Sequence, residues 1–285
     1  LMFYGKSSLP DQNAMSWLVE LLFAPEKAYE RPLFRVRNPQ VIAALKLETQ
    51  AQHLYPFKSV SQAFSPMIDM VQSLHSRPRE ERTPMQNQLV DLYLKVLRYY
   101  EISRSLSLIF PIDPIQSPAI AKALQVSPKT ELTYFHLIPK FRKIRDHLLS
   151  LQKKKPEAFS PVEREWLMLA HHMEQLRGDG RATLFRVLPP QWGQSDVWLS
   201  FWEMVDQSKG SPMSIRYLEQ WQTLLNAYHI QDAQAWNQAV PNVVATATQL
   251  SQSVASPKLL RLEQLYNQAD PFTKSLACYI LTFLL

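Results

Sequence analysis

The chain has 285 residues, of which 31 are basic and 25 are acidic, giving a formal net charge of +6. This length is enough to bury a core without help from a metal or a disulfide, and the single cysteine, Cys278, excludes an intrachain disulfide. No apolar run is long enough to span a bilayer. The moderate positive charge favours acidic or phosphate-bearing partners weakly and identifies none.

Proline is common and glycine is rare, at 21 and 5 residues. Proline suits the first position of a helix, because its φ is fixed and it lacks an N–H, while Ser, Thr, Asn and Asp suit the capping position before it. Eight predicted helix starts have this form: Asn38-Pro39, Ser65-Pro66, Thr83-Pro84, Ser117-Pro118, Ser160-Pro161, Ser211-Pro212, Ser256-Pro257 and Asp270-Pro271. The sequence therefore predicts an all-α (mainly α) fold, an irregular multi-helix domain.

The longest predicted helix runs from Pro84 to about Ile109 and is expected to be the central helix of the domain. Its apolar stripe contains Leu89, Leu92, Tyr93, Val96, Leu97 and Tyr100. The other helices are predicted at residues 13–23, 39–46, 59–75, 118–124, 130–152, 161–177, 195–207, 212–228, 231–252, 257–268 and 271–285. Pro139 and Pro241 are expected to bend their helices, because each removes a backbone hydrogen bond.

The clearest break in the chain is the triplet Gly178-Asp179-Gly180, so a boundary between subdomains can fall near 178–190. The following residues, 183–188, are rich in β-preferring side chains and bounded by turn residues, which predicts an extended segment. This segment can pair with 108–112 as a minor two-stranded ribbon, but a buried loop is the favoured interpretation.

The last ten residues, 276–285, carry no charge. Ten apolar residues are half of the ~20 that cross a bilayer, and runs of this length also form buried core helices. Of these two interpretations, our hypothesis is a soluble helical domain at 1–270, followed by the start of a transmembrane helix at 271–285.

The adjacent pair His171-His172 is the first candidate for a metal or haem ligand. At 100° per residue, His171 points away from the apolar stripe of its predicted helix, and His172 lies on the flank near Glu165. That stripe consists of Val162, Trp166, Leu169, Met173 and Leu176. The two rings diverge, whereas a metal needs helical ligands at i, i+3 or i+4. Surface histidines are the favoured interpretation, and this pair is the only candidate for binding a cofactor.

Recognisable catalytic patterns are missing from the sequence. It contains no Ser/His/Asp order typical of a triad, no spacing of zinc ligands and no glycine-rich phosphate loop. The carboxylates of Glu163 and Glu165 fall in the first turn of a predicted helix, where they complement its dipole. We therefore predict no catalytic residue and no metal site in this chain.

A basic stretch at 140–155 contains seven Lys or Arg residues and one acid, Asp146. Apolar residues recur through it at helical spacing, which predicts an amphipathic helix with a cationic outer face. A solvated face is the default interpretation, and contact with a phosphate or carboxylate is the alternative. The candidate contacts are Lys140, Arg142, Lys143 and Arg145. Because the outer face has no aromatic residue on which bases could stack, no nucleic acid is predicted as a partner.

A second basic group lies in a short extended stretch, where Arg31, Arg35 and Arg37 alternate with other residues. Alternation in an extended chain places side chains on one face. These guanidinium groups are candidates for binding a carboxylate or a partner, or for anchoring a buried ion pair. The ion pair is the favoured interpretation.

Several segments carry a family resemblance through their order. They are Phe3 to Ser8, Trp17 to Phe23 with Pro25-Glu26, Arg31 to Pro39, Glu81 to Pro84, Phe110 to Ile112 and Leu188 to Trp198. Together they resemble the extracytoplasmic insertion of CcsA/ResC-type (system II) cytochrome c biogenesis proteins, over roughly residues 1–205. The family's tryptophan-rich haem motif, W-G-x-x-W-x-W-D, is not matched, because Trp192, Trp198, Trp202 and Glu203 are spaced differently. The haem-handling role of that motif is therefore not assigned to these residues.

The resemblance implies a bacterial inner-membrane protein that moves haem outward and presents it to apocytochrome c for attachment. This domain would lie on the periplasmic (extracytoplasmic) side and reach the membrane through flanking segments. Haem is implied for the parent protein, a haem-attachment (synthetase) component, and no cofactor is implied for this chain. The expected role of the chain is to dock apocytochrome c or a partner biogenesis subunit without catalysis.

Two other classes of protein stay open. One is a soluble α-helical scaffold or adaptor with no haem role. The other is a cytosolic enzyme, which would require several titratable side chains to converge in one apolar pocket.

Overall fold

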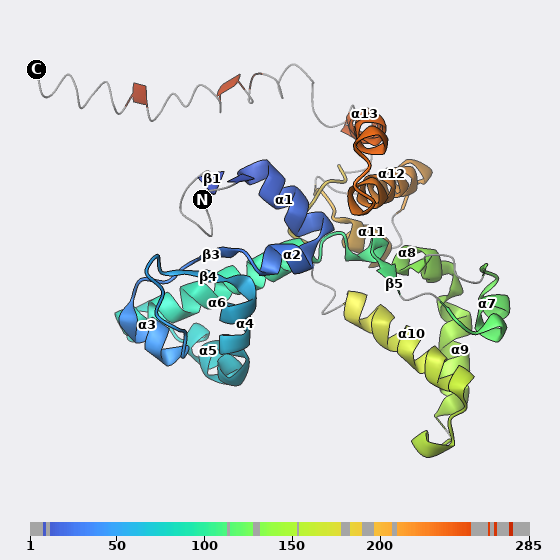
Figure 1. Cartoon of the computed structure of the whole chain (residues 1–285), viewed down its shortest axis with the longest axis horizontal. Helices are drawn as coiled ribbons and strands as arrows, with labels where there is room; N and C mark the ends of the chain where they lie inside the picture. Colours follow the sequence, from blue (N-terminus) through green and yellow to red (C-terminus); the bar gives the residue numbers. More distant parts are fainter. Residues whose placement is uncertain are drawn as a thin grey trace, which may run out of the picture.

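Figure 1 shows a computed structural model of the chain, which describes residues 8–9, 12–112, 115–127, 132–152, 154–177, 183–189, 197–206 and 210–251, with isolated positions beyond. The fold is mainly α-helical, as the sequence predicts. The helices are α1 (Ala14–Phe23), α2 (Pro25–Tyr29), α3 (Pro39–Ala44), α4 (Phe57–Phe64), α5 (Ile68–His75), α6 (Pro84–Ser103), α7 (Pro118–Leu124), α8 (Tyr134–Leu137), α9 (Phe141–Leu151), α10 (Pro161–Arg177), α11 (Phe201–Asp206), α12 (Pro212–His229) and α13 (Ala233–Ser251).

The predicted cap and proline pairs begin several of these helices. The side chains of Asn38, Thr83, Ser117 and Ser211 each accept a hydrogen bond from a backbone N–H of the helix that follows. These contacts satisfy N–H groups that have no partner within the helix. The pairs Ser256-Pro257 and Asp270-Pro271 lie outside the described residues.

Two predicted helices are each divided near a proline. The segment predicted at 59–75 forms α4, a 3₁₀ turn at Ser65–Met67 and α5. The segment predicted at 130–152 contains α8, a 3₁₀ turn at Ile138–Lys140 and α9. Proline lacks the N–H that would continue the helical bonding, so these breaks follow from Pro66 and Pro139. In contrast, Pro241 lies inside α13.

Helix α6 ends at Ser103, before the predicted end at Ile109. The Oγ atoms of Ser103, Ser105 and Ser107 each donate a hydrogen bond to a carbonyl three or four residues earlier, at 2.7–3.1 Å. Serine side chains that bond to the local backbone compete with the helical pattern. The chain therefore turns after α6 and continues as a 3₁₀ turn at Ser107–Ile109.

The predicted apolar stripe of α6 is correct in its first part only. Its residues from Leu89 to Val96 are buried, but Leu97 and Tyr100 are 39% and 44% exposed, whereas Tyr99 is fully buried. Toward its end α6 gains a further neighbour. The hydroxyl of Tyr99 donates to the Ala28 carbonyl oxygen of α2 at 2.9 Å, while its ring stacks on that of Phe57 in α4 with 4.8 Å between the centroids. A change of neighbours along the helix thus changes which face is buried.

Short antiparallel ribbons accompany the helices. Their pairs are β1 (Ser8–Leu9) with β2 (Gln12–Asn13), β3 (Pro32–Arg35) with β4 (Leu54–Pro56), and β5 (Pro111–Ile112) with β6 (Leu132–Thr133). The predicted pairing of 183–188 with 108–112 is wrong, because β5 pairs with β6 and Leu188 forms a bridge with Leu199. Strands this short take whichever edge the surrounding helices bring near, and their sequences do not specify that edge.

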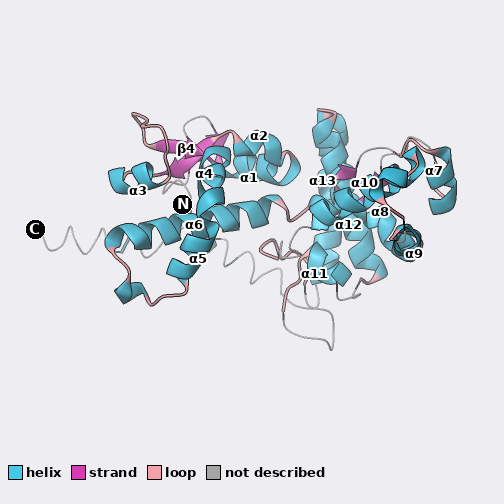
Figure 2. Ribbon diagram, turned by 90° about the horizontal axis from the view of Figure 1, so that it is seen from below, coloured by secondary structure: helices cyan, strands magenta, loops and turns pink. Residues whose placement is uncertain are grey.

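The buried side chains form two cores. The first core is enclosed by α2 to α6 and the ribbon β3–β4, and the second by α7 to α13, so we call these parts the first and second lobes. Figure 2 shows the two lobes at opposite sides of the view, with α6 running from the first toward the second. The cores divide near residues 103–106, and Met173 and Phe201, on either side of 178–190, both belong to the second.

Helix α1 contributes to both cores. Leu21 belongs to the first, whereas Leu22 and Phe23 belong to the second. Successive helical residues point about 100° apart, so one helix can present neighbouring side chains to two partners. The Phe23 ring contacts those of Trp221, Tyr228 and Trp236, at centroid distances of 5.6–6.0 Å.

No helix in the described ranges is long and apolar enough to cross a bilayer. The transmembrane start predicted at 271–285 lies outside those ranges, apart from isolated helical positions at Lys274 and Ser275.

The contacts of Phe23 predict that its truncation destabilises the whole chain. Phe23→Ala is expected to lower the free energy of unfolding by about 3–5 kcal/mol, because a buried aromatic ring leaves a cavity. Urea denaturation followed by circular dichroism measures the change. The matched control Met15→Ala, at a residue 69% exposed on the same helix, is expected to change stability by less than about 0.5 kcal/mol. Equal effects of the two variants would contradict the shared role of α1.

Candidate functional site

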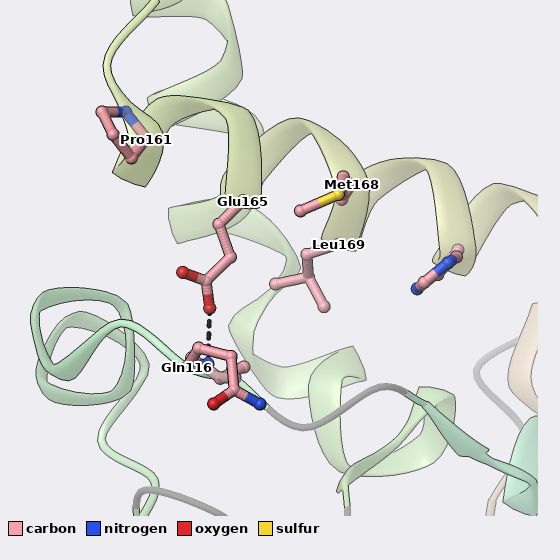
Figure 3. Close-up of a pocket in the computed structure, with 7 residues that line it drawn as sticks. Gln116, Pro161, Glu165, Met168 and Leu169 are labelled. Carbon is pink, nitrogen blue, oxygen red and sulfur yellow. Dashed lines mark hydrogen bonds between the residues drawn. The ribbon is translucent and has the colours of Figure 1, made fainter.

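A cleft of about 320 Å³ opens between α10 and the segment that leads into α7 (Figure 3). Its lining consists of Ile115, Gln116, Pro161, Glu165, Met168, Leu169 and His172. Glu165, Leu169 and His172 follow each other at i, i+4 and i+7, which places them on one face of α10. The cleft is therefore mostly apolar, with a carboxylate and an imidazole on one wall.

The carboxylate of Glu165 points toward the chain before α7 (Figure 3). Its Oε1 accepts hydrogen bonds from the backbone N–H groups of Gln116 and Ser117, at 2.6 and 3.0 Å. The N-terminus of a helix has unpaired N–H groups and the positive end of its dipole, so a carboxylate is stabilised there. Glu165 therefore joins α10 to α7 as an interhelical cap.

The two carboxylates of this region have different roles. Glu163 completes a capping box at the start of its own helix, since its Oε2 accepts from the Ser160 N–H at 2.8 Å and its N–H donates to Ser160 Oγ at 3.3 Å. The ammonium of Lys154 donates to Glu163 Oε1 at 2.5 Å, and this bond with the Ser160 contacts lowers the pKa of Glu163 to about 2. Glu163 thus matches the predicted dipole role, whereas Glu165 serves another helix.

The predicted histidine pair diverges in the structure. His172 lines the cleft beside Glu165, and His171 is exposed, with its Nε2 2.9 Å from the side-chain nitrogen of Gln175. The ring centroids of the two histidines are 6.5 Å apart. Within the described ranges, no cluster of three or more His, Cys, Asp or Glu side chains could hold a metal ion. Of the pair, only His172 faces a cavity.

The basic stretch forms α9 with its apolar residues inward, as its periodicity predicts. Ile144 and Leu151 are buried, and Phe141 and Leu148 are partly buried against the second core. The candidate contacts Arg142, Lys143 and Arg145 are exposed, and Lys140 is half-buried. The ammonium of Lys143 donates to the carbonyl oxygen of Ala123, near the end of α7, at 3.3 Å.

The three alternating arginines do not act as one group. Arg31 forms a bidentate ion pair with Glu20 on α1, in which Nη2 donates to Oε1 at 3.0 Å and Nε donates to Oε2. Glu20 is 7% exposed, whereas the side chain of Arg31 is 38% exposed, so the contact is partly buried. Arg35 ends β3 and Arg37 is exposed after it, and a register shift between Pro32 and Phe34 interrupts the strict alternation.

A cluster of tyrosines at the junction of α2 and α6 was not evident from the sequence. The hydroxyl of Tyr29 is 2.6 Å from Ser103 Oγ, and burial raises the pKa of Tyr29 to about 12. Burial also raises the pKa of Tyr99, whose ring lies 6.2 Å from that of Tyr29. The sequence feature that could have indicated the cluster is the adjacent pair Tyr99-Tyr100. The predicted apolar stripe included Tyr100, which is exposed, and left out Tyr99, which is buried.

In comparisons with known proteins, no protein-family model, no curated protein and no solved structure matches the chain. The chemistry of the cleft must be judged from its own groups. Glu165 is held by two backbone amides, so it is positioned to hold two helices together rather than to transfer a proton. The geometry favours binding of a small apolar group beside His172 over catalysis.

Removing the charge of Glu165 is expected to loosen the contact between α10 and α7. Glu165→Gln keeps one acceptor oxygen but loses the charge that favours the helix N-terminus, and we expect a loss of about 1–2 kcal/mol. Urea denaturation at pH 7 measures it. Glu174→Gln, at an exposed position of the same helix, is the matched control. A loss no larger than that of the control would show that the cap is not stabilising.

The raised pKa of Tyr29 predicts a loss of stability at alkaline pH. Below pH 10 the phenol is neutral in both states, but between about pH 10 and 12 it ionises only in the unfolded chain, which favours unfolding. The contribution is fully present below pH 10 and falls by about 1.4 kcal/mol per pH unit across this window.

The measurement is denaturation as a function of pH, with tyrosinate absorbance at 295 nm as the direct readout. Tyr29→Phe is expected to reduce the slope of stability against pH between 10 and 12 without abolishing it, because burial raises the pKa of Tyr99 and Tyr217 as well. An unchanged slope would contradict the burial of the Tyr29 hydroxyl.

Proposed function

We propose that this chain is a non-catalytic, extracytoplasmic domain of a bacterial cytochrome c maturation protein, and that it docks apocytochrome c or a partner biogenesis subunit. Haem would be handled by other parts of the parent protein, in the inner membrane.

The observation that carries the proposal is where the segments of the family resemblance lie. Trp17 to Phe23, Phe110 to Ile112 and Leu188 to Trp198 are far apart in sequence, yet residues from all three pack in or against the second core. Arg31, from a fourth segment, pairs with Glu20 in the first of these. Segments that define a common framework are expected to meet in this way, so their order and their contacts support the same assignment.

The side-chain chemistry supports docking rather than catalysis. Several carboxylates near helix starts are occupied as caps, among them Glu163 and Glu165. Glu203 likewise accepts from the Ser200 N–H at 2.8 Å, and its other oxygen accepts from Arg186 at 2.8 Å. A carboxylate used in this way would have to give up its structural hydrogen bonds before it could contact a substrate.

Calorimetric titration with a reduced apocytochrome c polypeptide tests the proposal. The polypeptide carries the Cys-x-x-Cys-His sequence to which haem is attached, and the matched control is the folded holocytochrome. We expect the apo form to bind with a dissociation constant near 1 µM, about −8 kcal/mol, and the holo form to bind at least tenfold more weakly.

A haemin titration, followed by the Soret band, provides the second arm. If neither the polypeptide nor haemin interacts with the chain, and the parent reading frame encodes no following membrane helices, the maturation proposal is wrong. A scaffold or adaptor with no haem role would then be the better assignment.

A further inference from the structure

The positive charge of the chain is concentrated in one place. Of the 31 basic and 25 acidic residues, seven basic residues and one acid lie in 140–155, so 24 of each sign remain in the rest of the chain. The net charge of +6 therefore equals that of this stretch alone. Outside residues 140–155, the protein has no net charge at neutral pH.

The stretch lies on an edge of the molecule. Figures 1 and 2, seen from directions 90° apart, both place α9 at the side of the second lobe farthest from α3 and α5. Its inner face packs against α10, where the imidazole of His147 lies 4.6 Å from the Trp166 ring, centroid to centroid. The opposite face of α9 is open to solvent along its length.

An exposed leucine lies within the cationic face. Arg142, Arg145 and Leu149 are at i, i+3 and i+7, which places them in one row about 10 Å long. The side chains of Arg142 and Arg145 are 88% and 69% exposed, and Leu149 is 50% exposed. A half-exposed leucine beside two arginines offers apolar surface and positive charge together, which suits a partner that is both anionic and apolar.

The acidic groups on this face are too few to neutralise it. Asp146 is the one acid of α9, and it is shared by Arg142 at 3.9 Å and Arg145 at 3.3 Å. All three side chains are more than half exposed, so these ion pairs are weak and leave an excess of positive charge. Lys154, in contrast, is engaged by Glu163.

We propose that the outer face of α9 binds an anionic lipid surface, with Arg142 and Arg145 at the phosphate groups and Leu149 inserted at the boundary of the acyl chains. Basic helices with an apolar residue on the contacting side bind membranes both by electrostatic attraction to anionic headgroups and by burial of apolar surface. A convex helix at the edge of the molecule can meet a flat surface without rearrangement. Nucleic acid fits less well because the face has no exposed aromatic side chain. An acidic peptide fits less well because a single helix face offers it no groove.

This inference goes beyond the proposed function, since lipid binding requires neither haem nor apocytochrome c. The test is sedimentation of the 285-residue chain with phosphatidylcholine vesicles that contain either 0% or 30% phosphatidylglycerol. We expect binding only to the anionic vesicles, and at least tenfold weaker binding at 0.5 M than at 0.05 M NaCl, because salt screens exposed charges.

Variants locate the contact. Each basic residue near an anionic surface contributes roughly fivefold in affinity, so the pair Arg142→Gln and Arg145→Gln is expected to weaken binding about 30-fold. The control pair, Arg77→Gln and Arg216→Gln, makes the same change in net charge at exposed positions elsewhere and is expected to weaken it less than threefold. Leu149→Ala is expected to weaken binding about fivefold, and Ile230→Ala, at a residue 71% exposed, to leave it unchanged.

Three outcomes would overturn the inference. The first is no sedimentation with anionic vesicles. The second is an equal loss of vesicle binding in the two double arginine variants, which would show that binding depends on total charge and not on one face of the protein. The third is tighter binding of a poly-glutamate peptide or a DNA duplex than of the vesicles, measured by competition. Circular dichroism melting of each variant verifies that a loss of binding is not a loss of folding.

Discussion

The division of α1 between two cores is the constraint on which the arrangement of the lobes depends. Leu21 faces the first core, and the next two residues, Leu22 and Phe23, face the second. The ion pair of Glu20 with Arg31 fixes the same helix to the chain that leads into β3. Breaking this partly buried ion pair would leave the buried Glu20 carboxylate without its partner, so the contact disfavours a rotation of α1 that separates the two groups.

The second lobe holds the two candidate surfaces, the cleft beside α10 and the cationic face of α9. These two helices pack side by side, and Lys154 and Glu163 join them near the turn that connects them. Glu163 and Glu165 are both used as caps, at the starts of α10 and α7. Side-chain hydrogen bonds therefore hold the helices that carry both surfaces.

Much of the fold could be predicted because its signals are local. A capping side chain before proline acts within one helical turn, so α3, α6, α7 and α12 begin where the sequence places them. Several helix ends were also predicted, as at Phe23 of α1, Leu124 of α7 and Arg177 of α10. The exception is α6, which ends at Ser103. Strand pairing depends on distant contacts, and the pairing of 183–188 with 108–112 is not found. For the candidate site, periodicity placed His172 near Glu165, but it could not reveal that Glu165 caps a helix more than 40 residues earlier. No local pattern encodes which helix start a carboxylate will reach.

The shared helix also limits how the chain can be divided. A fragment that stopped at Ser103 would keep α1 and leave Phe23 facing water. A fragment that began at Arg104 would lack the ring that fills the space between Trp221, Tyr228 and Trp236. The first piece would keep every buried residue of the first core but expose Leu22 and Phe23, and the second piece would lose these two side chains from its own core. The two hydrophobic centres are therefore coupled through α1, and deletion of the first half is expected to destabilise the second.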